Sequence, residues 1–219
     1  MGRKQPKPKE PKPWERPPWP SKGDRSQRKL YEAIGRALSQ WERYEGVLSL
    51  VFSNLVASDC PTIARRAYSA VRTFEGRSDM LSAASFAYFS EWPDEKLLIA
   101  FKGVLRAAKS FNLRRIDLAH GAVDYYFPNP RPATWRPGNS YALYPSYANF
   151  KDRDVKDVPS YCYTSRELEN LRMEFHLLQK PALQLAQDLS RRRLQPSPSM
   201  YGQQSPQSTN RAAEKKHRQ

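Results

Sequence analysis

The chain has 219 residues, enough for one domain or two small ones, and its 37 Lys and Arg against 22 Asp and Glu give a net charge of +15. Most of this excess lies at the ends, since residues 1–25 hold eight basic and three acidic residues and residues 191–219 hold seven basic and one acidic. Two cysteines are too few for a disulfide framework or a cysteine-based zinc site, and no apolar run is long enough to span a bilayer. We therefore expect a soluble cytoplasmic protein with reduced thiols.

The first 25 residues are rich in proline and lysine and lack the apolar core of a signal peptide. Because proline fixes φ and removes a backbone donor, we predict a disordered or polyproline-like tail over residues 1–25. Trp14 and Trp19 within it are either docking anchors or solvated side chains. Residues 193–219 are predicted to be a second disordered tail. Both basic tails could attract nucleic acid or simply keep the chain in solution.

Between the tails, apolar residues recur every three or four positions, which indicates amphipathic helices. The first helix is predicted over about 26–58 and ends before Pro61, because the residue before a proline avoids helical backbone angles. The second helix begins at Pro61 and is expected to break or kink at Gly76. A third helix is expected to run to about Val123.

A fourth helix, 166–192, is expected to kink at Pro181. Such helices cannot bury their apolar stripes alone, so residues 26–192 are predicted to form a mainly α domain, an antiparallel four-helix bundle. A long irregular insertion, about 124–164, lies between the third and fourth helices. Within it, Ser140–Tyr144 and Ser160–Thr164 are typical of the two strands of a small β-hairpin.

Aromatic residues in the insertion are interleaved with arginines. This composition favours a loop that packs its own small core over the bundle, with stacking on single-stranded bases as the alternative. The residues concerned are Tyr125, Tyr126, Phe127, Arg131, Trp135, Arg136, Tyr141, Tyr144 and Tyr147.

The segment from Arg114 to Gly121, RRIDLAHG, closes the third predicted helix. It resembles the R-N-x-x-A-H-G form of the Arg-x4–6-His signature of HEPN domains, and the resemblance covers about residues 26–190. Bacterial proteins in which such a helix end precedes an irregular insertion and a last helix share this layout. The resemblance implies a four-helix bundle, commonly dimeric, in a family with many metal-independent ribonucleases of toxin–antitoxin and phage-defence systems.

The residue types in this motif suit RNA cleavage by the 2′-hydroxyl, which needs two proton transfers and charge relief at the phosphate. His120 suits the proton transfers because the unperturbed pKa of histidine is about 6.5. Arg115 suits the phosphate because a guanidinium stays cationic and matches two of its oxygens. We predict these two as catalytic residues. Arg114 is a second cationic candidate, and Asp117, three residues before His120, could orient the imidazole.

Residues five apart on a helix point about 140° apart, so Arg115 and His120 do not share a face of one ideal helix. In dimeric relatives the motifs of two chains face each other, which predicts a homodimer with a composite site. Alternatively, a carboxylate of the same chain pairs with Arg115, or His120 only caps its helix, with Gly121 as the C-cap. Ile116 stands where active relatives often carry Asn, and its side chain cannot form a hydrogen bond.

The sequence thus predicts an endoribonuclease that acts on RNA without metal or cofactor, a toxin or defence effector with an antitoxin or operon partner. The alternative is a non-catalytic dimeric module whose basic tails attract nucleic acid. His176, on the fourth predicted helix, is interpreted as packed and hydrogen-bonded rather than catalytic. Three histidines are too few for a His-rich metal site.

Overall fold

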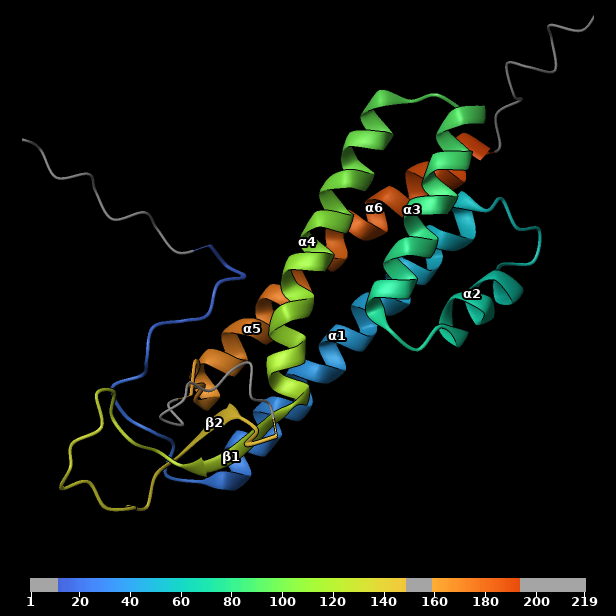
Figure 1. The fold of residues 1–219 in the computed structure, drawn as a ribbon. Helices are drawn as coiled ribbons and strands as arrows, with labels where there is room; N and C mark the ends of the chain where they lie inside the picture. The colour runs from blue at the N-terminus through green and yellow to red at the C-terminus, as the bar shows by residue number, and fades with distance from the viewer. Residues whose placement is uncertain (1–11, 149–158, 194–219) are drawn as a thin grey trace, which may run out of the picture.

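The structure is a computed structural model that describes residues 12–148 and 159–193. Residues 1–11, 149–158 and 194–219 lie outside the described residues, and with them the predicted C-terminal tail, the start of the N-terminal tail and part of the insertion. The described part is mainly helical and carries a small two-stranded antiparallel sheet (Figure 1). The predicted helical bundle with a small hairpin is confirmed.

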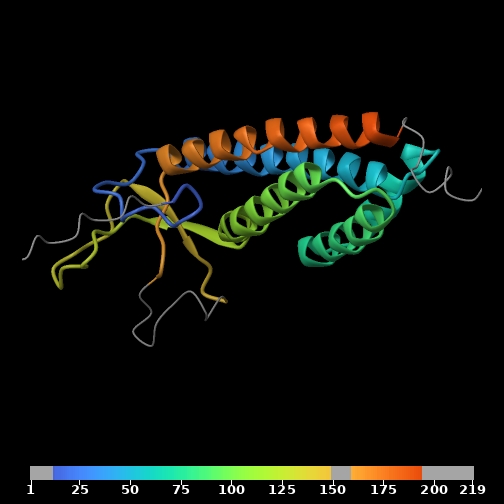
Figure 2. The same ribbon diagram turned by 90° about the horizontal axis from the view of Figure 1, so that it is seen from above.

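Helix α1 (Gln27–Leu55) is the centre of the fold, because every other described helix contacts it. Helix α4 runs against the direction of α1, whereas α5 and α6 follow each other alongside α1 in its own direction (Figures 1 and 2). The other helices are α2 (Pro61–Ala70), α3 (Phe74–Glu91), α4 (Glu95–Ala119), α5 (Ser165–Leu177) and α6 (Gln179–Arg193). None of the described helices combines the length and the apolar character needed to cross a membrane.

The core of the bundle is built around Trp41, which is fully buried on α1. Its ring centroid lies 5.6 Å from that of Phe74 on α3 and 5.2 Å from that of Phe175 on α5. Burying one large aromatic side chain contributes about 2–3 kcal/mol, so this contact is a main attachment between three helices. The remaining buried apolar residues of α1 follow the predicted stripe: Leu30, Ala33, Ala37, Tyr44, Val47, Leu48, Val51, Phe52 and Leu55.

The break in the second predicted helix lies at residues 71–73, and not at Gly76. The Thr73 side chain accepts a hydrogen bond from the backbone N–H of Gly76 at 3.1 Å and so caps the start of α3. Gly76 lies in the first turn of α3, where a Cβ would come within 2.8 Å of Val71 Cγ1. The glycine therefore provides space for the preceding turn, and Thr73 marks the boundary.

The kink expected at Pro181 is present as an interruption between α5 and α6, at Leu178. Proline has no N–H to donate to the carbonyl four residues earlier, and its ring collides with that carbonyl. That carbonyl belongs to Leu177, the last residue of α5. The position of the break therefore follows from the position of the proline.

The hairpin differs from the prediction in its partner strand. Strand β2 (Tyr141–Pro145) pairs antiparallel with β1 (Gly121–Tyr125), with Val123 opposite Leu143. The predicted partner segment, 160–164, makes only one bridge, in which Leu143 and Tyr163 exchange backbone hydrogen bonds of 2.8 and 2.9 Å. The third helix was predicted to run to about Val123, but α4 ends at Ala119, and the chain continues from Gly121 as β1.

Residues 12–25 pack against the domain, in contrast to the disordered tail predicted over 1–25 (Figure 1). Trp14 packs edge-on against Phe111 at 6.1 Å between ring centroids, and Asp24 forms a β-bridge with Tyr141. The many prolines prevent a helix here, but they do not prevent an extended segment from docking through its tryptophans. Trp14 and Trp19 therefore anchor the segment to its own chain.

Candidate functional site

Helix α4 carries the motif at its C-terminal end. Its side chains Phe101, Val104, Ala108, Phe111 and Leu118 are buried in the core. The sequence pattern places Arg115 in this row, but Arg114 is the buried arginine, 7% exposed, and Arg115 is half-buried. A repeat of 3.6 residues per turn continues from Phe111 to Arg114 and Leu118, and this turns Arg115 away from the centre of the row.

The backbone geometry at the end of α4 accounts for the glycine that follows His120. His120 is the C-cap, and its backbone N–H donates to the carbonyl of Ile116 at 3.0 Å. A Cβ on Gly121 would lie 2.8 Å from the Asp117 carbonyl oxygen and 2.6 Å from Leu143 Cδ1. Only glycine therefore lets the chain turn from the helix into β1 at this point.

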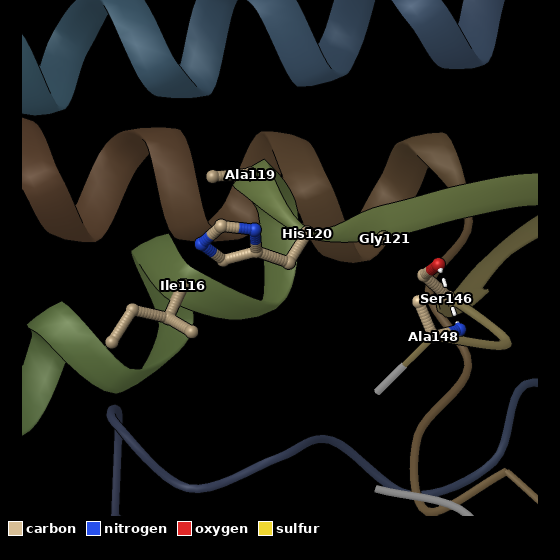
Figure 3. A pocket seen from close by; sticks show the side chains of 6 residues that line it. All are labelled: Ile116, Ala119, His120, Gly121, Ser146 and Ala148. Atoms are coloured by element: carbon tan, nitrogen blue, oxygen red, sulfur yellow. Dashed lines mark hydrogen bonds between the residues drawn. The ribbon is translucent and has the colours of Figure 1, made fainter. Parts of the chain in front are cut away.

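The His120 side chain is exposed and borders a hollow of about 540 Å³ at this helix end. The imidazole extends on the side of Ile116, and Ser146 and Ala148 lie opposite (Figure 3). The backbone N–H of Ser146 donates to the His120 carbonyl at 3.3 Å, which ties the histidine to the end of β2. The residues that line the hollow are Ile116, Ala119, His120, Gly121, Ser146 and Ala148.

Arg115 does not line this hollow, so a single chain does not bring the two predicted catalytic side chains together. Within the described residues, its Nε is buried without a hydrogen-bond partner, and no ion pair to a carboxylate is formed. A buried guanidinium nitrogen without a partner is costly, and an anion or a second chain could satisfy it. The alternative in which an internal carboxylate pairs with Arg115 finds no support in the described part of the chain.

Asp117 is the most heavily bonded residue of the motif. Its carboxylate, 3% exposed, accepts two hydrogen bonds from Arg16, at 3.2 and 2.8 Å, and one from the Tyr163 hydroxyl at 2.8 Å. Burial, and next the negative charge of Asp117, raise the pKa of Tyr163, so its hydroxyl stays protonated and donates. Arg114 Nε lies 3.3 Å from the same carboxylate.

These bonds give Asp117 and Arg114 a positioning role. Among the described residues, no hydrogen bond of the Asp117 carboxylate reaches His120. The Tyr161 hydroxyl also donates to the Asp117 carbonyl at 3.0 Å, and so satisfies one of the last carbonyls of α4. The helix end is thus fixed from two distant segments, and the imidazole is exposed at the surface.

Sequence reasoning missed Ser146, Arg16, Tyr161 and Tyr163 as neighbours of the motif. Ser146 directly follows the observed β2 and lies two residues beyond the predicted strand Ser140–Tyr144. The alternation of aromatics in 160–164 is the one signal that marked Tyr161 and Tyr163 as strand-like. His176 was predicted to be packed and hydrogen-bonded. The prediction of packing was wrong, because the side chain is exposed, and its Nδ1 lies 3.4 Å from Nε2 of Gln40. No group of three His, Cys, Asp or Glu side chains suited to a metal ion occurs among the residues that the structure describes.

Comparison of the chain with protein-family models, curated proteins and solved structures finds no match. A function therefore has to be inferred from the geometry at the end of α4.

Proposed function

We propose that this chain is a HEPN-like, metal-independent endoribonuclease and that His120 transfers protons in the reaction. The observation that carries the proposal is the exposed imidazole at the edge of the hollow, held in place by backbone bonds on both sides of it. Histidine is the side chain best suited to give and take protons near neutral pH. The Asp117 bonds support the proposal because they fix the segment that presents this imidazole.

In the proposed reaction, a base takes the proton of a ribose 2′-hydroxyl and the 2′-oxygen attacks the adjacent phosphorus. The bond from phosphorus to the 5′-oxygen then breaks, and that oxygen receives a proton from an acid. The products are a 2′,3′-cyclic phosphate and a 5′-hydroxyl. His120 takes the first proton as the base and then gives it to the leaving oxygen as the acid, so one imidazole serves each site.

Arg115 would stabilise the phosphate charge from the second copy, because it lies outside the His120 hollow of its own chain. Its Nε, which is buried and has no hydrogen-bond partner among the described residues, fits a residue whose partner arrives with another chain or with an anion. The functional unit in this proposal is therefore a homodimer with composite sites.

We place this ribonuclease in the cytoplasm, where it would act as a toxin or defence effector with an operon-encoded partner. Cys60 and Cys162 are both free thiols, which fits a reducing compartment.

The test is cleavage of a labelled single-stranded RNA in the presence of a chelator. We expect wild-type protein to cleave, His120→Ala to lose the activity, and the matched control His176→Ala, also exposed and distant in the sequence, to retain it. Circular dichroism and thermal unfolding check that the fold is unchanged. Cleavage that is equal in wild-type and His120→Ala protein would exclude the proposal.

Mixing two inactive variants tests the composite site. In a dimer of His120→Ala with Arg115→Ala, one of the two sites keeps both wild-type side chains, so a 1:1 mixture should recover about a quarter of the activity. A site within one chain predicts no recovery.

A second candidate is a non-catalytic nucleic-acid-binding module, and the observation that favours it is Ile116. This apolar side chain lines the hollow beside His120, where a hydrogen-bonding side chain would be expected. The module predicts salt-sensitive RNA binding without cleavage. Removing residues 1–11 and 194–219, while keeping the packed residues 12–25, should then weaken binding and reduce its salt dependence.

A further inference from the structure

The hairpin that begins at His120 carries an aromatic surface at its far end. We call Tyr125, Phe127, Arg131 and Trp135 the stacking surface. Arg131 is exposed, Phe127 and Trp135 are half-buried, and Tyr125 is 44% exposed. The loop that carries three of these residues projects from the end of the bundle (Figures 1 and 2).

The stacking surface is fixed by a second aromatic layer beneath it. The ring of Phe127 stacks on that of Tyr144, with centroids 5.0 Å apart and planes inclined by 6°, and it also lies 5.5 Å from Trp19. The backbone of Phe127 is held as well, since Trp19 Nε1 donates to its carbonyl at 3.0 Å and its N–H donates to the Tyr144 hydroxyl at 3.1 Å. The position of Phe127 is thus set before any ligand binds.

Arg131 and Trp135 form the outer layer. The guanidinium carbon of Arg131 lies 4.2 Å from the ring centroid of Trp135 and 5.4 Å from that of Phe127. The small core of this region consists of Tyr126, Ala142, Tyr144 and Cys162, with Trp19 and Phe127 packed against it. Arg131 and Trp135 lie outside that core. Trp135 packs edge-on against Phe127, with ring centroids 6.0 Å apart, and remains half-buried.

The loop beyond β1 carries only positive charge, and the nearest acidic residue on β1 is Asp124, which accepts a hydrogen bond from the backbone N–H of Tyr125 at 2.7 Å. From Tyr125 to Ala148 the sequence contains two arginines, Arg131 and Arg136, and no Asp or Glu. Aromatic faces next to exposed arginines, without carboxylates, match a strand with negative phosphates and unpaired bases. A duplex fits less well, because its base faces are already stacked.

We propose that the stacking surface binds single-stranded RNA and leads the strand to His120, which rests on the proposed ribonuclease function. Strand β1 connects the two places directly, and its five residues, Gly121–Tyr125, span about 17 Å. A short oligonucleotide bridges this length. Bases stack on Trp135 and Tyr125, and Arg131 contacts the phosphates.

The test is the binding of a fluorescein-labelled 2′-O-methyl RNA oligonucleotide of about ten nucleotides, chosen because the proposed reaction cannot cleave it. We expect Trp135→Ala and Arg131→Ala to weaken binding by about tenfold or more, as for the loss of one stacked base. Phe86→Ala on α3, which removes an aromatic side chain that is 80% exposed, and Arg106→Ala on α4 are the matched controls and should bind like wild type. A duplex of the same sequence should compete poorly.

Trp135→Phe separates stacking from folding, because it keeps an aromatic face. It should retain affinity within about twofold and lose the part of the tryptophan quenching that RNA causes at this residue. Undiminished quenching in Trp135→Phe, or equal binding by Trp135→Ala, Arg131→Ala and the two controls, would overturn the inference. So would equally tight binding of the duplex.

The two proposals fail separately. Tight binding that depends on Trp135, with no cleavage of ordinary RNA, would overturn the ribonuclease and leave the binding surface. Cleavage that depends on His120 but is indifferent to Trp135 and Arg131 would overturn the binding surface and leave the ribonuclease.

Discussion

Arg16 and Asp117 are 101 residues apart in the sequence and form a two-point ion pair, with Nη2 2.8 Å from Oδ1 and Nε 3.2 Å from Oδ2. The guanidinium of Arg16 also stacks over the ring of Tyr161 at 4.5 Å. The pair therefore joins the N-terminal segment, the end of α4 and the chain that leads into α5. This ion pair is the main interaction that holds in place the segment that presents His120.

We expect Asp117→Ala to lower the free energy of unfolding by about 3–5 kcal/mol, because it leaves the buried Arg114 and the half-buried Arg16 without their carboxylate. Arg16→Ala should cost less, about 1–3 kcal/mol, since Tyr163 and Arg114 still face the carboxylate. Urea unfolding measures both values.

The matched control is Arg28→Ala, which removes an arginine from an exposed pair with Glu32 on α1. Such pairs contribute at most about 0.5 kcal/mol. Equal destabilisation by Arg16→Ala and Arg28→Ala would contradict the inference that Arg16 holds the end of α4 in place. A double-mutant cycle of Arg16→Ala with Asp117→Ala should show coupling, because the two side chains are in contact.

Gly121 and Gly103 give opposite predictions for the same substitution. A Cβ at Gly121 would collide with Leu143 and the Asp117 carbonyl, whereas a Cβ at Gly103, inside α4, would meet nothing within 4 Å. We expect Gly121→Ala to destabilise the protein by about 1–3 kcal/mol and to shift His120. Gly103→Ala should stabilise it by about 0.5–1 kcal/mol, because alanine is the better helix former.

Thermal unfolding of both variants checks the signs, and the cleavage assay checks the position of His120. If Gly121→Ala were as stable as wild type, a Cβ at residue 121 would not collide with Leu143 and the Asp117 carbonyl.

The repetition of apolar residues was sufficient to predict the bundle, because each helix shows one stripe and the stripes have to cover one another. The positions at which helices break were harder to predict from the sequence. Gly76 is the more conspicuous residue, but the Thr73 side chain decides where α3 begins, and a cap of this kind depends on a local hydrogen bond. The prediction for Pro181 succeeded because the steric conflict of proline is independent of its surroundings.

The candidate site was predictable only in part. The exposure of His120 agrees with its position at a helix end, and the 140° separation between His120 and Arg115 is a property of any α-helix. The partners of Asp117 were not predictable, because Arg16 lies in a segment whose proline content indicates disorder. Contacts over such sequence distances follow from the fold as a whole and leave little trace in a local pattern.

Ala57 is a position where substitution by glycine should stabilise the folded protein. It follows the end of α1 with a φ of 48°, a left-handed conformation that costs an alanine about 1 kcal/mol. The backbone N–H groups of Ala57 and Ser58 donate to the carbonyls of Asn54 and Ser53, the bond pattern of a Schellman motif, in which glycine usually takes this place.

We expect Ala57→Gly to raise the free energy of unfolding by about 0.5–1 kcal/mol. Ala67→Gly, at an exposed position inside α2, is the matched control and should lower it by about 1 kcal/mol. Denaturant unfolding of the two variants gives the comparison. A loss of stability in both would mean that Ala57 is not left-handed.

Cys162 should make the stability of the protein sensitive to alkali. Burial raises the pKa of its thiol from 9.0 to about 12, because the thiolate would lose its hydration. In the unfolded chain the thiol ionises near its ordinary pKa, so between about pH 9 and 12 the unfolded state has lost a proton that the folded state keeps. Stability is therefore unaffected below pH 9 and falls as pH rises through this window, by at most about 1.4 kcal/mol per pH unit for this group.

Cys162→Ala should reduce the slope of unfolding free energy against pH, whatever it does to the stability at neutral pH, whereas Cys60→Ala, at an exposed site, should leave the slope unchanged. Buried tyrosines whose pKa is also raised, such as Tyr44 and Tyr163, account for the slope that remains. The same burial predicts that iodoacetamide at pH 8 modifies Cys60 in the folded protein and reaches Cys162 only on unfolding. Equal labelling rates at both cysteines, together with an unchanged slope in Cys162→Ala, would show that the thiol is open to solvent.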